Sequence, residues 1–297
     1  MREIACSARG TMTGSTIELH CNATIGAMRT RCAIALSILL LASSLRVAAA
    51  EHPSLAKARA LYNAGDHDGA ITAAAMARQD PASADAAALV SARSHLERYR
   101  LRTSDTSDLA AAREALASIR VAGLKPRDQI DLLVGLGQAL FLANSFGAAA
   151  ELFDSALARA ATLPDRDRLL LLDWWASAVD REAQSLPYDR RAAALHRVIE
   201  RSEVELRENP GNAAANYWLA VSARGAGDPE RAWHAAAAAW VRAPLWPETA
   251  AALRHDIDQL VTTVLIPERA RRRSPREHEE ALNALRAEWE SIKTDWK

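Results

Sequence analysis

Cysteine, aromatic side chains and strand-forming patterns are all scarce in this 297-residue chain. Its three cysteines all precede residue 51, which excludes a disulfide framework or a thiolate metal site from the rest of the chain. Aromatic residues make up 5% of the chain, while alanine supplies much of the 49% that is hydrophobic. The β-branched runs and Asn-Gly turns typical of strands are missing. Because alanine is the strongest helix former, this composition predicts an all-α protein.

An excess of charge of either sign is also missing. Basic and acidic residues number 37 each, which argues against a nucleic-acid-binding surface. One local basic run, ERARRRSPRE at 268–277, is flanked by acids. We interpret it as a solvated helix end rather than a phosphate-binding patch.

Residues 28–50 have the three parts of a secretory signal peptide. A basic start, an apolar stretch and small residues accepted by signal peptidase follow one another: Arg29 and Arg31, residues 33–42, and Ala48–Ala50. The apolar stretch is too short for a comfortable transmembrane helix, and Arg46 follows closely behind it. We therefore expect cleavage before Glu51 and an exported protein, periplasmic or secreted. The alternative is an uncleaved signal anchor, which is the only way in which we expect the chain to contact a membrane.

Residues 135–157, GLGQALFLANSFGAAAELFDSAL, hold two helical patterns separated by Asn144-Ser145. On both sides of this break, apolar residues recur at spacings of one face of a helix. Small residues alternate with large ones along these faces, namely Gly137, Ala149 and Ala156 among the small and Leu140, Phe141 and Phe153 among the large. This pattern predicts two helices that cross closely around a short turn.

Other parts of the chain repeat this organisation. Residues 56–81 have a turn at Gly65-Asp66, and residues 212–244 have one at Gly227-Asp228. In the latter, Pro229 after a capping Asp228 marks a helix start. Weaker helical pairs fill the two intervals, at 84–99 with 107–120 and at 167–184 with 189–208, and two more helices are predicted near 247–264 and 275–295.

These stretches resemble the tetratricopeptide repeat family. Its unit of about 34 residues has two antiparallel helices, with small residues at positions eight and twenty, a bulky one at twenty-four and alanine at twenty-seven. Gly137, Ala149, Phe153 and Ala156 stand at these positions, whereas the other two copies carry alanine in the bulky position. The resemblance implies a right-handed α-solenoid of about five helix pairs over residues 51–246, with residues 247–297 capping its end.

No catalytic, cofactor-binding or metal-binding constellation stands out from the sequence. Asp66-His67-Asp68 contains three potential metal ligands, but it falls in an inter-helix turn, and we interpret it as a polar turn and helix cap. Gly135 and Gly137 fall inside a helix, where a phosphate cannot reach backbone amides. We therefore expect no enzyme activity, no cofactor and no metal site.

In the tetratricopeptide family, the first helix of each repeat lines a concave groove. By this resemblance, the candidate groove residues of the first, third and fifth repeats are Leu55, Arg59 and Tyr62; Val134, Gln138 and Phe141; and Tyr217, Val221 and Arg224. Such a mixed apolar, aromatic and basic lining suits an extended peptide or an amphipathic helix.

The helix predicted at 167–184 presents a polar face. The spacing of Asp173, Ser177 and Asp180 places them together on one side of it. They line the groove in one interpretation. In the other, the two aspartates pair with Arg181 or Arg190 and the adjacent tryptophans pack in the core.

We expect a non-catalytic adaptor or scaffold of the cell envelope, whose groove holds a segment of a partner protein and not a nucleic acid. Two alternatives remain open. One is an envelope enzyme, or a protein that binds a small molecule or sugar, using the Asp173–Arg181 face. The other is a structural scaffold that assembles with itself.

The signal segment gives a direct prediction. Residues 1–27 show neither a period nor a core, and we interpret them as a gene-model extension, with translation starting at Met28, or as a disordered segment. Edman sequencing of the exported protein should start at Glu51. A mature N-terminus upstream of Met28 would contradict this assignment.

Overall fold

The computed structural model describes residues 51–102, 106–272 and 276–297, and every regular element in these ranges is a helix. Contacts divide the chain into two units, Met1–Ala50 and Glu51–Lys297, and the second contains all of the described residues. The predicted signal segment, the residues before it and all three cysteines lie outside the described residues. None of the described helices is both long and apolar enough to cross a membrane.

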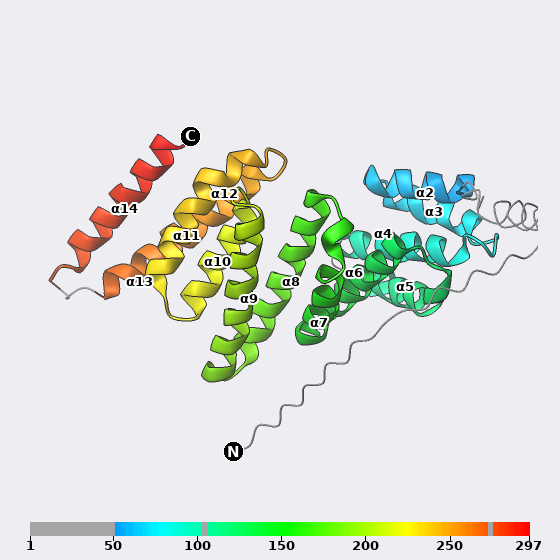
Figure 1. Ribbon diagram of the computed structural model, residues 1–297, viewed down its shortest axis with the longest axis horizontal. Coiled ribbons are helices and arrows are strands. Elements are labelled where there is room, and N and C mark those ends of the chain that lie inside the picture. Colours follow the sequence, from blue (N-terminus) through cyan, green and yellow to red (C-terminus); the bar gives the residue numbers. More distant parts are fainter. Residues whose placement is uncertain (1–50, 103–105, 273–275) are drawn as a thin grey trace, which may run out of the picture. The chain divides into compact units, whose positions relative to one another are not determined.

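Between Pro53 and Arg242 the described chain folds into ten α-helices that follow one another closely (Figure 1). They are α2 (Pro53–Asn63), α3 (His67–Ala77), α4 (Ala84–Arg102), α5 (Thr106–Ala117), α6 (Pro126–Leu142), α7 (Phe146–Leu157), α8 (Asp165–Ser185), α9 (Tyr188–Glu208), α10 (Ala213–Gly225) and α11 (Pro229–Arg242). Short 3₁₀ turns at Val121–Gly123, Ala160–Thr162 and Ala243–Leu245 join some of them. The predicted all-α class is therefore confirmed.

The three turns predicted from the sequence are formed by residues with positive φ. Gly65, Asn144 and Gly227 have φ values of 80°, 59° and 91°, and they follow the ends of α2, α6 and α10. Glycine and asparagine tolerate this left-handed conformation better than other residues. Asp66 and Asp228 then cap the next helices, accepting from the backbone N–H groups of Gly69 (2.9 Å) and Arg231 (3.0 Å).

The packing follows the order of the chain. Each helix from α2 to α11 contacts the next one, and the even-numbered helices also contact one another in series: α2 with α4, α4 with α6, α6 with α8, and α8 with α10. Side chains on the even-numbered helices are therefore brought together from widely separated parts of the sequence. This row of helices positions the candidate site.

A close crossing holds α6 against α7. Phe153 of α7 is fully buried, and a Cβ atom added to Gly137 of α6 would lie 2.5 Å from its Cε1 atom. Ala149 and Ala156, one turn of α7 to either side, are also fully buried. The missing side chain of Gly137 thus leaves room for the ring, as the alternation of small and large residues predicts.

The C-terminal residues form a separate group of helices. They are α12 (Ala250–Gln259), the π-helical segment η4 (Leu260–Leu265), α13 (Ile266–Arg271) and α14 (His278–Asp295). Pro267 has no N–H to donate to the preceding turn, and the neighbouring N–H of Ile266 bonds five residues back to Val261. Trp289 of α14 is 1% exposed and packs edge-on against Trp240 at 5.5 Å between ring centroids.

The last predicted helix, near 275–295, corresponds to α14, which begins at His278 and ends at Asp295. Arg276 and Glu277 form a turn before it. Ser274 and Pro275 lie outside the described residues.

The crossing of α6 and α7 can be tested with two glycines of the same helix. Alanine in place of glycine inside a helix ordinarily stabilises by about 1 kcal/mol. For Gly137→Ala we expect a net loss of ~1–2 kcal/mol instead, because the Phe153 ring must move. The matched Gly135→Ala places its Cβ 3.3 Å from a Leu116 methyl group and should cause no loss. Urea unfolding followed by circular dichroism measures both, and equal stabilisation of the two would contradict the crossing.

Candidate partner-binding groove

A groove of about 940 Å³ runs along the even-numbered helices α2, α4, α6 and α8, with contributions from the α2–α3 turn and from Leu163 before α8. Its lining includes five of the residues predicted for a partner groove, namely Arg59, Tyr62, Val134, Gln138 and Asp173. These side chains come from three helices that are far apart in the sequence. The serial contacts of the even-numbered helices bring them together.

Ion pairs cross the groove lining from helix to helix. Arg59 of α2 reaches Asp128 of α6 at 2.8 Å, and Arg127 of α6 reaches Asp167 of α8 at 2.7 Å. A third carboxylate, Asp131, is 3.4 Å both from Arg127 and from Arg93 of α4. Arginine and aspartate thus alternate along this part of the groove, and their ion pairs link helices that are distant in the sequence.

The α8 side of the groove carries apolar residues beside its charged ones. Leu163, Leu170, Leu171 and Trp174 line it, and Leu170 is 50% exposed. Trp174 is held in place from behind, because its ring packs against Phe141 at 5.1 Å and against Phe153 at 5.9 Å. A half-exposed leucine beside a supported tryptophan gives an incoming apolar side chain something to pack on.

The remaining predicted groove residues do not line this cavity. They are Leu55, Phe141, Ser177, Asp180, Tyr217, Val221 and Arg224, of which Leu55 is a buried core residue. Phe141 packs between Phe146 and Trp174, and Arg224 of α10 is engaged by Glu268 of α13 through both carboxylate oxygens. The partial burial of Phe141 follows from its position over α8, which the repeat pattern alone does not specify.

Neither of the interpretations offered for the polar face of α8 is complete. Asp173 lines the groove and accepts a hydrogen bond from Trp218 Nε1 at 2.9 Å, while Asp180 accepts one from Gln184 at 2.8 Å. The expected pairing of these aspartates with Arg181 or Arg190 is not among the ion pairs of the described residues. Trp175 is a core residue, 1% exposed, as expected, but Trp174 is a groove residue.

Burial raises the pKa of both aspartates, and the bonds from Trp218 and Gln184 oppose the shift. Tyr217 of α10 lies in the same electrostatic environment. Burial, reinforced by Asp256, Asp173 and Asp180, raises its pKa to about 12. The Tyr217 hydroxyl therefore stays protonated at neutral pH.

Sequence reasoning missed Arg93, Arg127 and Leu170, all of which line the groove. Arg93 and Leu170 belong to the weaker helical pairs, and Arg127 precedes the part of the third repeat that matches the family pattern. The repeat positions therefore did not identify them. A usable signal existed for α4, where Leu89, Arg93 and Glu97 follow one another at four-residue spacing and share a face.

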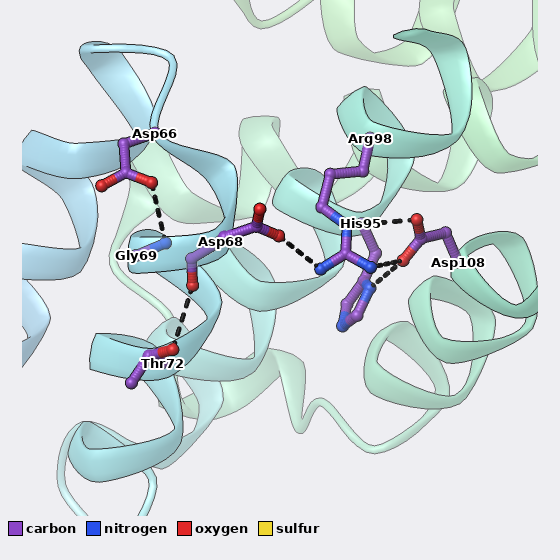
Figure 2. Close-up of polar contacts among 7 residues, drawn as sticks. All are labelled: Asp66, Asp68, Gly69, Thr72, His95, Arg98 and Asp108. Atoms are coloured by element: carbon purple, nitrogen blue, oxygen red, sulfur yellow. Dashed lines mark hydrogen bonds and ion pairs between the residues drawn. The ribbon is translucent and has the colours of Figure 1, made fainter. Parts of the chain in front are cut away.

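Of the Asp66-His67-Asp68 stretch, Asp68 takes part in a polar network that joins α3, α4 and α5 (Figure 2). Asp66 is the helix cap predicted from the sequence, whereas Asp68 bonds to Arg98 of α4 at 2.7 Å. Arg98 also binds Asp108 of α5, which is 1% exposed and lies 2.7 Å from His95 Nδ1. Within the described part of the chain, no three His, Cys, Asp or Glu side chains are placed to hold a metal ion.

Two carboxylates on the same arginine allow a matched test of this network. Asp108→Ala should lower the free energy of unfolding by ~3 kcal/mol, because it removes the buried carboxylate that binds both the largely buried Arg98 and His95. Asp68→Ala should cost less than ~1 kcal/mol, because the Asp68 side chain is 62% exposed. Urea unfolding measures both variants. Equal losses would show that burial of Asp108 does not control the strength of the network.

Comparison of the chain with protein-family models, curated proteins and solved structures finds no match.

Proposed function

We propose that the chain is a non-catalytic adaptor of the cell envelope whose groove holds a segment of a partner protein. The observation that carries this proposal is the groove itself. Four successive even-numbered helices contribute to one continuous lining, and this lining combines a charged part with a partly exposed apolar wall. An extended or helical segment of a protein can use both.

The scaffold that we propose is a right-handed solenoid of about five tetratricopeptide-like helix pairs, α2–α3 to α10–α11, with the helices of residues 247–297 as its cap. Three features support it. The sequence-predicted turns have positive φ, Gly137 makes room for Phe153, and the first helices of successive pairs contact one another. The burial of Trp289 of α14 between α11 and α12–α13 supports the capping role.

Export remains part of the proposal through the signal segment at residues 28–50. In this proposal, export brings the adaptor to the periplasm or outside the cell. The groove would then meet other envelope proteins. No cofactor is needed for this role.

Site-specific photo-crosslinking tests the groove as a partner site. A photoreactive amino acid at Val134, in the groove, should give crosslinks to a protein of an envelope extract. The same amino acid at Val121, exposed in the 3₁₀ turn away from the lining, should give none. Adding Leu170→Asp to the Val134 probe should abolish the crosslink, because a charge replaces the exposed apolar wall. Val121→Asp is the matched control, since it places the same charge on a similarly exposed residue outside the groove.

The same preparation separates the alternatives. Equal crosslinking from Val134 and Val121, or crosslinking unaffected by Leu170→Asp, contradicts the adaptor. A bound small molecule in the native mass spectrum, without a protein partner, would favour the enzyme or sugar-binding alternative at the Asp173–Arg181 face. Concentration-dependent light scattering of the purified chain would favour the self-assembling scaffold.

A further inference from the structure

The charges in the groove are not evenly distributed. The lining from α2, α3 and α4 contributes three arginines, Arg59, Arg93 and Arg100, against one acid, Glu97. The lining from α6 and α8 contributes Arg127 and Arg166 against four acids, Asp128, Asp131, Asp167 and Asp173. The groove therefore has a cationic side and an acidic side. A partner segment that matches it carries its acidic group toward α2 and α4.

Arg93 stands out among the cations because its hydrogen-bonding capacity is partly unused. Its guanidinium lies over the ring of Tyr62, 4.7 Å from the ring centroid. Its ion pair with Asp131 is long, 3.4 Å, and its Nε atom is buried without an acceptor among the described residues. The Nε atom of Arg59 also lacks a hydrogen-bond acceptor, but Arg59 and Arg127 each hold a carboxylate at 2.8 Å or less, which Arg93 does not.

A buried donor that lacks an acceptor costs free energy, and a carboxylate is the acceptor that fits a guanidinium in two parallel hydrogen bonds. The guanidinium of Arg93 also packs on the Tyr62 ring.

Asp131, the carboxylate nearest to Arg93, is shared between two arginines. Asp131 lies 3.4 Å from Arg93 and 3.4 Å from Arg127, so a single negative charge faces two guanidinium groups. Glu97, the other acid of this side, is bound by Arg100 at 2.8 Å. Among the ion pairs of the described residues, Arg93 therefore has only the long one with Asp131, whereas Arg127 also binds Asp167.

We propose that Arg93 receives the carboxylate of an acidic side chain within the partner segment, while an apolar side chain of the same segment packs on Leu170 and Trp174. This inference rests on the proposed function and names the chemistry of the partner. Arg93 is then the residue that sets the preference for acidic segments. The carboxylate belongs to a side chain inside the segment and not to a chain end.

The test is a selection from a library of random peptides that are flanked on both sides by fixed linkers, so that no free terminus enters the groove. Wild-type protein should enrich peptides with Asp or Glu beside an apolar residue. Arg93→Gln should lose the enrichment of acids, and Arg93→Glu should enrich Lys and Arg instead. Arg113→Gln, which removes an exposed arginine of α5 outside the lining, should select the same peptides as wild type.

The best peptide, acetylated and amidated, is then compared with its Glu→Gln or Asp→Asn version by fluorescence anisotropy on wild-type protein. We expect the neutral version to bind about tenfold more weakly or worse. Because this comparison uses wild-type protein, misfolding of a variant cannot explain its result. The preference of Arg93→Glu for basic peptides likewise shows that this variant has a folded groove. Equal affinity, or selected peptides without acids, overturns the role of Arg93 but leaves the adaptor standing. If wild type enriches no peptide, or if Leu170→Asp enriches the same ones, the proposed function fails as well.

Discussion

The fold depends on how closely two helices approach where small residues face a large one. At the crossing of α6 and α7, Gly137 leaves the space that the Phe153 ring fills, and buried alanines line α7 on either side. Fully buried alanines also line α3 and α11, where they let the paired helices approach closely. A helix pair built in this way buries few large side chains by itself. It gains a sufficient core only by packing against the pairs before and after it, as the cluster that spans α6 to α10 illustrates.

That serial packing has a direct consequence for the groove. Because the even-numbered helices contact one another, residues 69 positions apart, such as Arg59 and Asp128, form an ion pair across the lining. Each such pair fixes one even-numbered helix relative to another, which keeps the groove preformed. A preformed groove loses less conformational entropy when a segment binds, so more of the contact energy contributes to affinity.

The features that the sequence reveals are the local ones. A turn that needs positive φ selects glycine or asparagine, and a close crossing selects glycine or alanine at helical spacing; both are visible at Gly65, Asn144, Gly227 and Gly137. The lining of the groove depends instead on how helices of different pairs are rotated against each other. This rotation packs Phe141 against Trp174, and nothing within the helix of Phe141 specifies that contact. The hydrogen-bond partner of Asp173, Trp218, is 45 positions away for the same reason.

In the adaptor that we propose, the groove serves binding and not catalysis. A general acid or base needs a reachable partner group and a pKa suited to its task. Most of the carboxylates of the lining are paired with arginines, and Asp173, whose pKa is raised by burial, accepts a hydrogen bond from the neutral indole of Trp218. The lining also holds the guanidinium of Arg93, packed on Tyr62, and the half-exposed side chain of Leu170, and we propose that both contact the partner segment.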